Sequence, residues 1–400
     1  MTVRFNRAEL VIYFANSTWY GPSGTDRHIS ESLSRHAPVL YIEPPVSALT
    51  VLRNPAYARS LAGAPPLEAL GPRLVRAGTT VAPGMTRPIL HHLTAPMVRR
   101  ATRAIVDRLC GPARVRRGVA GIVSCREKSL WATLPARRTL FYATDDLPAG
   151  AELLGLPRGR LVRDEARTLR GAGAIAVVSP DLQRRYERSG YHATLVPNGC
   201  RPEAYDGVDA APLPADADLP GPVAGFVGYL NQRIDFTLLE AVAGAGISTL
   251  IVGPVVPGLN QERLAALARR PNVRWVGSKP FEELPGYLRL IDVGLTPYAD
   301  TAFNRASFPL KTLEYLAAGR GVVATPLPAN AWLGTDLVAE AAGPADFVAR
   351  VQRELARPRT AQLAGRRRAF AREHSWDRRA QVLADLLDLP VAALPGEPAR

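Results

Sequence analysis

The sequence lacks the features that mark membrane-spanning, secreted and zinc-binding proteins. Its 400 residues contain no run of about 18 apolar residues, so we expect no membrane-spanning helix. The three cysteines, Cys110, Cys125 and Cys200, lie far apart and form no CxxC pair, which argues against a disulfide framework and a zinc site. We therefore expect small buried thiols in a reducing, cytoplasmic compartment and no bound metal.

Lysine is also scarce, since only Lys128, Lys279 and Lys311 accompany the arginines, yet the net charge is +14. Residues 1–200 hold 28 basic and 14 acidic side chains, whereas residues 201–400 hold 22 of each. Aromatic residues are not interleaved with the basic ones, which argues against a nucleic-acid partner. The excess favours an anionic surface or substrate near the N-terminal half. Arginines spread over solvated faces are the alternative.

Short apolar runs alternate with amphipathic stretches, as in parallel sheets covered by helices, and 400 residues suit two such domains. Strands are expected at Leu10–Ala15, Val39–Ile42, Gly121–Cys125, Thr139–Ala143, Ala174–Val178, Val223–Val227, Ser248–Val252, Val273–Val276, Val293–Thr296 and Gly321–Thr325. The expected helices include Pro180–Ser189, Pro280–Ile291 and Pro309–Ala318. Residues 204–221 are rich in Pro, Ala and Asp, which predicts a linker between domains at 1–203 and 222–375. A further helix is expected over 376–389.

Residues 304–325 carry the strongest chemical signal. Ser307 and Leu310 stand at the expected start of a helix, and Lys311 lies in its first turn. A cation there opposes the helix dipole by about 0.3–1 kcal/mol, which makes sense if the free N–H groups and Lys311 bind a phosphate. Glu314, one turn on, is placed to accept hydrogen bonds from a ribose or sugar diol. The alternative is an internal Lys311–Glu314 pair on a solvated face.

A second signal follows the expected strand Val223–Val227. Gly228 ends this strand and a polar turn leads to Arg233. This is the first βα turn of a doubly wound domain, where ligands meet the carboxyl ends of strands. Gly228 would let the backbone approach a pyrophosphate, and Arg233 would clamp it. Together with Lys311, two cations would face one diphosphate; a plain surface arginine is the alternative.

Residues 304–325 resemble the donor-site helix of GT-B glycosyltransferases, especially the family 4-like (glycosyltransferase group 1) retaining enzymes of bacterial polysaccharide or glycoconjugate biosynthesis. The shared pattern is a small/Pro/Lys lead-in, a Glu, an apolar helix, a Gly and a Val-Val-Ala-Thr strand. The resemblance covers residues 222–389 and, more weakly, the N-terminal half. It implies an α/β fold of two Rossmann-like domains facing a cleft, with residues 376–389 crossing back to the first domain. It also implies a nucleotide diphosphate sugar as donor, no other cofactor, no metal, and a ribose contact for Glu314. A second Glu often stands eight positions before that residue, and here this position is Ala306.

In the N-terminal half, the resemblance implies that the Gly-rich loop ending at Gly24 faces the donor, although it has no GxGxxG fingerprint. His28 follows this loop and is a candidate for touching acceptor or donor phosphate; a histidine on a packed helix face is the alternative. Asp146 follows the strand Thr139–Ala143 and is a candidate for orienting an acceptor hydroxyl or acting as its base. A structural cap is equally compatible with that position. Arg126 and Glu127 occupy a similar strand end.

We therefore predict a glycosyltransferase that moves a sugar from a nucleotide diphosphate sugar to a hydroxyl acceptor in cell-surface polysaccharide or glycolipid synthesis. The basic N-terminal half suits a lipid-linked or anionic acceptor and peripheral association with the inner membrane face. Three alternatives stay open: a natural-product tailoring enzyme, a GT-B-fold sugar-nucleotide epimerase, and a non-catalytic partner subunit. Product analysis with the donor alone separates an epimerase from a transferase.

Overall fold

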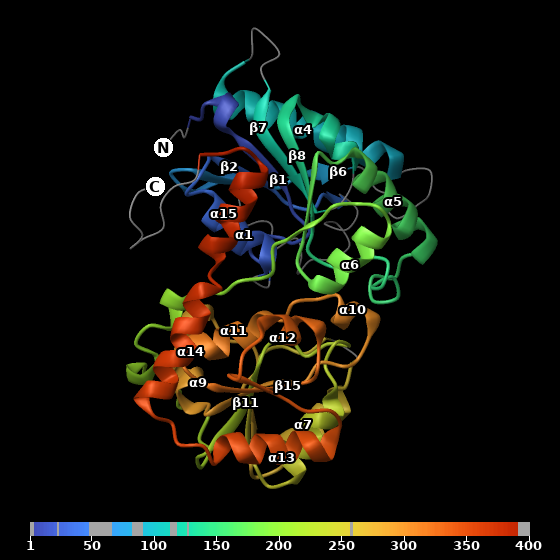
Figure 1. Ribbon diagram of the computed structural model, residues 1–400. Helices are drawn as coiled ribbons and strands as arrows, with labels where there is room; N and C mark the ends of the chain where they lie inside the picture. The colour runs from blue at the N-terminus through green and yellow to red at the C-terminus, as the bar shows by residue number, and fades with distance from the viewer. Residues whose placement is uncertain are drawn as a thin grey trace. The chain divides into compact units, whose positions relative to one another are not determined.

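The computed structural model describes residues 4–21, 24–47, 66–81, 91–112, 118–125, 128–256 and 259–390. These residues form two compact α/β units (Figure 1). Unit 1 comprises the described residues up to Val178, then Leu182–Val196, and those from Trp376 onward. Unit 2 comprises Ser179–Asp181 and Pro197–Ser375. Within the described ranges, no helix has the length and apolarity needed to cross a bilayer.

Unit 1 is built on a sheet with the strand order β10-β9-β8-β7-β1-β2-β5-β4, in which only β4 and β5 pair antiparallel. Its strands are β1 (Val11–Phe14), β2 (Val39–Ile42), β4 (Leu67–Gly71), β5 (Leu74–Ala77), β7 (Val119–Ser124), β8 (Ala136–Ala143), β9 (Ala174–Val177) and β10 (Thr194–Leu195). A separate pair joins β3 (Val46–Ser47) to β6 (Thr80–Val81). The α-helices of unit 1 are α1 (Thr25–Leu33), α4 (His91–Cys110), α5 (Arg158–Gly171), α6 (Pro180–Arg188) and α15 (Trp376–Leu386).

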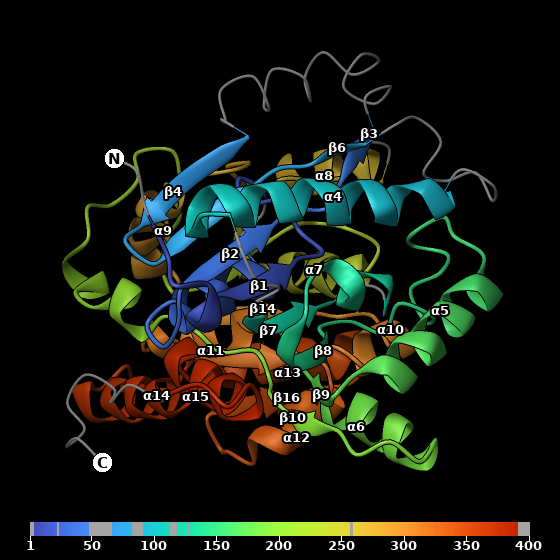
Figure 2. The same ribbon diagram turned by 90° about the horizontal axis from the view of Figure 1, so that it is seen from above.

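The central strand β1 is buried along its whole length because helices cover both faces of this sheet. Val106 of α4 packs on one face together with Ile12 and Phe14, and Figure 2 shows α4 running across that face. On the other face, α15 lies beside α1, and Leu387 reaches Gly121 of β7. Helices on both sides explain why the strands of this sheet read as continuous apolar runs.

Unit 2 contains a parallel sheet with the strand order β13-β12-β11-β14-β15-β16. This is the 3-2-1-4-5-6 order of a doubly wound fold. The direction in which successive strands are added to the sheet reverses between β11 and β14. The strands are β11 (Val223–Val227), β12 (Ser248–Val252), β13 (Val273–Trp275), β14 (Val293–Thr296), β15 (Gly321–Ala324) and β16 (Val338–Glu340). The helices are α7 (Phe236–Gly244), α8 (Gln261–Ala268), α9 (Leu284–Leu290), α10 (Ala302–Arg305), α11 (Leu310–Ala317), α12 (Pro328–Leu333), α13 (Pro344–Leu355) and α14 (Ala361–Glu373).

The sequence missed the antiparallel hairpin of β4 and β5 and the edge strand β16. Strand β4 is mostly half-buried and has no apolar alternation, and β16 is only three residues long, so neither carries a clear period. The helix expected over Pro280–Ile291 is instead a 3₁₀ turn, Phe281–Glu283, followed by the shorter α9. Pro285 explains this change, because a proline lacks the amide hydrogen that a continuous helix would use there.

The boundary between the units lies near Val196 rather than at the predicted residue 203. Residues 197–203 pack within unit 2, where the Asn198 side chain donates to the Phe308 carbonyl at 2.7 Å. The Cys200 N–H donates to the His374 carbonyl at 3.0 Å. Backbone and side-chain bonds of this kind tie the segment to its unit more strongly than its composition suggests.

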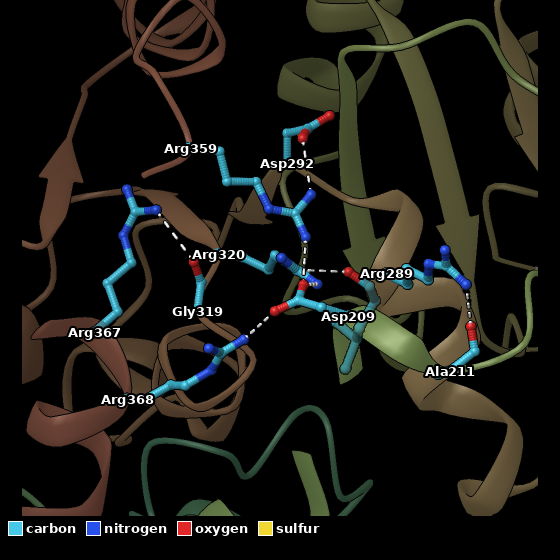
Figure 3. A network of polar contacts seen from close by, with 10 residues as sticks. Asp209, Ala211, Arg289, Asp292, Gly319, Arg320, Arg359, Arg367 and Arg368 are labelled. Atoms are coloured by element: carbon cyan, nitrogen blue, oxygen red, sulfur yellow. Dashed lines mark hydrogen bonds and ion pairs between the residues drawn. The ribbon is translucent and has the colours of Figure 1, made fainter. Parts of the chain in front are cut away.

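The segment expected as a linker, residues 204–221, is docked onto unit 2 by a polar network (Figure 3). Asp209 accepts hydrogen bonds from Arg320 and Arg359, each at 2.8 Å, and from Arg368. Arg320 is inaccessible to solvent. Arg359 also contacts Asp292 at 3.1 Å, whose other oxygen accepts the Val223 N–H at 2.8 Å. Val223 begins β11, Asp292 directly precedes β14, and Arg320 directly precedes β15. The network therefore lies at the amino edge of the sheet.

Candidate functional site

The candidate site lies at the opposite, carboxyl edge of the unit 2 sheet, where β11 and β14 diverge. Gly228 follows β11, and a Cβ atom on it would lie 3.7 Å from Cε of Lys311. The two residues predicted to meet one diphosphate are therefore neighbours. Gly253 approaches from β12, so closely that a Cβ atom there would be 1.8 Å from the Gly228 carbonyl oxygen. This edge is thus made of tightly packed backbone in which a side chain on Gly253 would not fit.

Lys311 and Glu314 form an ion pair, with 2.7 Å between Nζ and Oε2. Their side chains are 26% and 16% exposed, so the pair is partly accessible to a ligand. Burial opposes the charge on Lys311, but the Glu314 carboxylate outweighs it and raises the pKa of the lysine. Lys311 therefore carries its positive charge throughout the neutral range, and both predicted roles involve groups that already lie together.

Arg233 is held in a fixed orientation. Its Nε donates to Oδ1 of the fully buried Asn304 at 2.9 Å, and its guanidinium lies 5.4 Å from the Tyr298 ring centre and 5.1 Å from that of Phe303. The Asn304 amide donates in turn to the carbonyls of Arg233 and Ala299, at 2.8 and 2.7 Å. The two terminal nitrogens of Arg233 make no hydrogen bond to any described residue, so they are available for an anion.

Ser307 does not start helix α11. The helix begins at Leu310 with Pro309 as its cap residue and without a side-chain cap. The Ser307 hydroxyl donates to the Phe303 carbonyl at 2.8 Å, so its proton is already used and cannot be offered to a phosphate, which only accepts. The Ser307 side chain is thus engaged within unit 2, and its predicted contact with the donor stays a prediction. Leu310 is half-buried at the first turn.

Tyr315, which the sequence analysis did not single out, fixes helix α11 against the sheet. Its hydroxyl accepts the Val227 N–H at 2.8 Å, at the end of β11. Its ring lies where a side chain on Gly294 would stand, since a Cβ atom there would be 2.2 Å from the ring. These contacts position Lys311 and Glu314 relative to Gly228. A glycine in the middle of a strand, facing a close neighbour, was the available signal.

The position of the second family glutamate is occupied by a buried alanine. Ala306 is 1% exposed, and its carbonyl accepts the Ser179 hydroxyl at 2.6 Å. The neighbouring Arg305 forms an exposed two-bond pair with Asp300, at 2.5 and 2.6 Å. On the other side of the site, the half-exposed Trp275 ends β13 and donates to the Gly253 carbonyl at 3.0 Å.

In unit 1, the candidates His28 and Asp146 take part in packing and capping. His28 is 6% exposed and stacks on Trp376 of α15, with 5.4 Å between ring centres. Asp146 accepts the Ala149 N–H at 2.9 Å and pairs with Arg185 at 3.3 Å. These contacts favour the structural alternatives considered for both residues.

Gly24 is the cap residue of α1, with an extended backbone conformation, and it lies at the end of the loop that follows β1. Arg126 and Glu127 lie outside the described residues, as do Pro22 and Ser23 of the same loop.

A buried carboxylate in unit 1 escaped the sequence reasoning. Asp26 accepts hydrogen bonds from the Tyr13 hydroxyl at 3.0 Å and from the N–H groups of Asn16 and Ser17 at 2.7 and 3.1 Å. It therefore fixes the loop between β1 and α1 at the carboxyl edge of its sheet. Burial, together with the Asp26 charge, raises the pKa of the neighbouring Cys125 thiol. Acidic residues are common in first helical turns, so the sequence offered no distinct signal.

Residues 221–357 match the family model described as glycosyl transferases group 1. A curated relative, the putative teichuronic acid biosynthesis glycosyltransferase TuaH of Bacillus subtilis, is 35% identical over 162 residues, or 39% of this chain. The match covers 41% of that relative, so the chain spans well under half of its length.

Solved structures share the architecture of the whole chain. Sucrose-phosphate synthase from Thermosynechococcus elongatus has a TM-score of 0.69 at 17% identity, covering 95% of this chain and 98% of that one. HepE from Anabaena, in complex with UDP and glucose, has a TM-score of 0.62 at 14% identity, covering 95% and 99%. An alpha,alpha-trehalose-phosphate synthase from Burkholderia vietnamiensis has a TM-score of 0.62 at 15% identity, covering 96% and 99%. These similarities confirm the GT-B fold that the sequence predicted.

Proposed function

Because residues 221–357 are a domain of the glycosyl transferases group 1 family within a GT-B fold, we propose that this protein transfers a sugar from a nucleotide diphosphate sugar to a hydroxyl acceptor. The observation that carries the proposal is the arrangement of two cations at the carboxyl edge of the unit 2 sheet. Lys311 lies beside Gly228, and Arg233 is held with its terminal nitrogens available. A diphosphate at this edge would contact both.

In the proposed reaction, the bond between the sugar and the diphosphate breaks while the acceptor hydroxyl takes the sugar and loses its proton. Negative charge then grows on the leaving diphosphate, and Lys311 and Arg233 stabilise it from fixed positions without a metal. Glu314 accepts hydrogen bonds from the ribose hydroxyls, while the phosphate replaces it as the partner of Lys311. The reaction proceeds with retention of configuration, as in the enzymes that the sequence resembles.

We assign the reaction to the assembly of a cell-surface polysaccharide or glycolipid. The similarity to a teichuronic acid biosynthesis glycosyltransferase supports a polymer as the product class. The excess of basic residues in positions 1–200 supports an anionic or lipid-linked acceptor on the cytoplasmic side of the membrane.

The test is the change in melting temperature on adding UDP-, GDP-, dTDP- or ADP-sugars. We expect one of these donors to raise the melting temperature. Lys311→Ala should weaken its binding about ten- to hundredfold and remove most of the shift, because a charge-assisted hydrogen bond contributes about 1.5–3 kcal/mol. Arg366→Ala removes an exposed cation of unit 2 that is paired with Asp336, and serves as the matched control. Equal shifts in both variants would refute the site.

A further inference from the structure

The sheet of unit 1 has a topological switch point of its own. Strands β2, β5 and β4 lie on one side of β1, whereas the later strands β7 to β10 lie on the other. In doubly wound sheets, ligands bind outside the carboxyl ends of the strands at such a reversal. The segment that leaves the carboxyl end of β1, residues 15–21, is therefore positioned to contact a ligand.

A tight turn in this segment is anchored on buried groups. The Gly21 N–H donates to the Thr18 carbonyl at 3.2 Å. Trp19 and Tyr20 therefore occupy the two central positions of the turn. Trp19 is 5% exposed, and its N–H donates to Oε1 of the buried Glu43, which follows β2, at 2.7 Å. The backbone that carries Tyr20 is thus fixed from inside the unit.

The Tyr20 side chain is held in place as well, although it is 59% exposed. Its hydroxyl donates to Oε1 of Glu68 in β4 at 2.6 Å, and the Arg76 guanidinium lies over its ring, 5.2 Å from the ring centre. Arg76 is itself buried and donates two hydrogen bonds to Glu43, at 2.9 and 2.8 Å. An ordinary exposed tyrosine changes rotamer freely, whereas a buried ion pair sets the orientation of this ring.

The exposed ring and the carboxylate beside it match the chemistry of a sugar. The face of an aromatic ring is electron-rich and attracts the weakly positive C–H groups on the flat side of a pyranose. A ring that is fixed in advance loses little conformational entropy on binding. Glu68 is 26% exposed and offers its carboxylate to a sugar hydroxyl. Since Glu43 and Glu68 face the single cation of Arg76, the cluster is negative overall and disfavours an anionic sugar.

We propose that Tyr20 and Glu68 form a subsite for a neutral sugar unit of the acceptor. The sugar stacks on the exposed face of Tyr20 and donates a hydroxyl hydrogen bond to Glu68. An acyl chain would cover the ring but would leave the carboxylate unused, whereas a pyranose uses both groups. The inference rests on the proposed function, which requires a hydroxyl acceptor, and it adds the chemical class of the acceptor group that unit 1 contacts.

The test is saturation-transfer NMR of the full chain with the methyl β-glycosides of glucose and galactose and of the two corresponding uronic acids. We expect at least one neutral glycoside to bind, and its uronate to bind about threefold more weakly. Glu68→Gln should remove this preference, because the amide oxygen still accepts the Tyr20 hydroxyl but carries no charge.

The contribution of the aromatic face is measured with variants of the same residue. Tyr20→Leu keeps an apolar side chain without a flat ring and should raise the Kd of the neutral glycoside about tenfold. Tyr20→Phe keeps the ring and should raise it less than about threefold. The control is Tyr191→Leu, because Tyr191 is a half-buried tyrosine of the same unit that precedes β10 and so lies at the amino edge of the sheet. It should leave Kd unchanged.

Three results would overturn the subsite. They are the absence of saturation transfer to both neutral glycosides, an unchanged Kd in Tyr20→Leu, and an equal loss in Tyr20→Leu and the Tyr191 control. The thermal shift with the donor sugar is measured on the same proteins. Tyr20→Leu should keep this shift, because Lys311 and Arg233 belong to unit 2. Failure of the donor shift in the unaltered protein counts against the proposed function, whereas an intact donor shift with one of these three results counts against the subsite alone.

Discussion

The guanidinium of Arg233 is oriented by Asn304, which lies 71 residues further along the chain. If Asn304 acts through Arg233, we expect Asn304→Ala to weaken donor binding about tenfold by releasing the guanidinium from its position. In an Arg233→Ala background the same change should have no further effect on Kd, because the group that it positions is gone. Kd is measured by titration calorimetry on all four proteins. Additive losses would show that Asn304 affects donor binding independently of Arg233 and would contradict this role.

Among single residues, the sequence was informative where a charged residue or a glycine follows the end of an expected strand. The closeness of Lys311 to Gly228 could be predicted because the segments after strand ends in a doubly wound pattern meet at one edge; the roles of these residues and of Arg233 toward a donor stay predictions. Asn304 and Tyr315 could not, since their roles depend on partners that only the folded chain brings within hydrogen-bonding distance. The hydrogen bond of the Ser307 hydroxyl to the Phe303 carbonyl could not be predicted either, because it depends on the turn that precedes α11.

Among the structural elements, residues 204–221 are docked by two carboxylates, Asp216, which pairs with Lys279, and Asp209, which reaches a buried arginine. Asp209 is 51% exposed, yet it is the acidic partner of the fully buried Arg320. We expect Asp209→Ala to lower the free energy of unfolding of unit 2 by about 2–3 kcal/mol, less than the 3–5 kcal/mol typical of fully buried pairs, because water partly compensates. Urea unfolding, followed through the transition of unit 2, measures this change.

The matched control for this prediction is Asp206→Ala in the same segment. Asp206 is 64% exposed and pairs with Arg372 at 3.6 Å, so its removal should cost less than about 0.5 kcal/mol. A similar loss in both variants would contradict the special role of Asp209. The sequence predicted a linker here because the Pro-, Ala- and Asp-rich segment has no hydrophobic periodicity. Ion pairs to residues far along the chain produce no such periodicity, so they could not be predicted.

Across the whole molecule, buried phenols predict sensitivity to alkali. Burial raises the pKa of Tyr13, Tyr142 and Tyr186 in unit 1 and of Tyr205 and Tyr315 in unit 2. A folded pKa above the unfolded value means that stability is complete below the unfolded pKa of about 10 and falls as the pH rises beyond it. Each such group contributes a loss of about 1.4 kcal/mol per pH unit.

We therefore expect the unfolding temperature of unit 2 to stay constant between pH 8 and about 9.5 and to fall steeply above about pH 10. The transition of unit 1 should fall first, since the Cys125 thiol adds to its phenols, and burial raises the pKa of that thiol as well. Calorimetric scans over this pH range, with absorbance at 295 nm to follow phenolate, measure both effects. Ionisation before unfolding of more phenols than the exposed tyrosines, such as Tyr20 and Tyr229, would contradict the burial of these rings.

At this scale the sequence predicted two α/β domains correctly but not the edges of each unit. Half-buried segments such as β4 carry weak periodicity, and the boundary near Val196 depends on hydrogen bonds made by Asn198 and Cys200. Composition marks where a chain is irregular, whereas contacts decide which unit an irregular segment joins.

Unit 1 is discontinuous, and this has a consequence for the order in which the protein is made. Unit 2 has all its residues once Ser375 has been synthesised. Unit 1 must still wait for α15, which supplies Trp376 against His28 and Asp377 as a partner of Arg35, and for Asp388 just after it, a partner of Arg138 at 2.6 Å. During translation the first unit to begin is therefore the last to be finished. The core of unit 1 therefore closes only after every residue of unit 2 has been made.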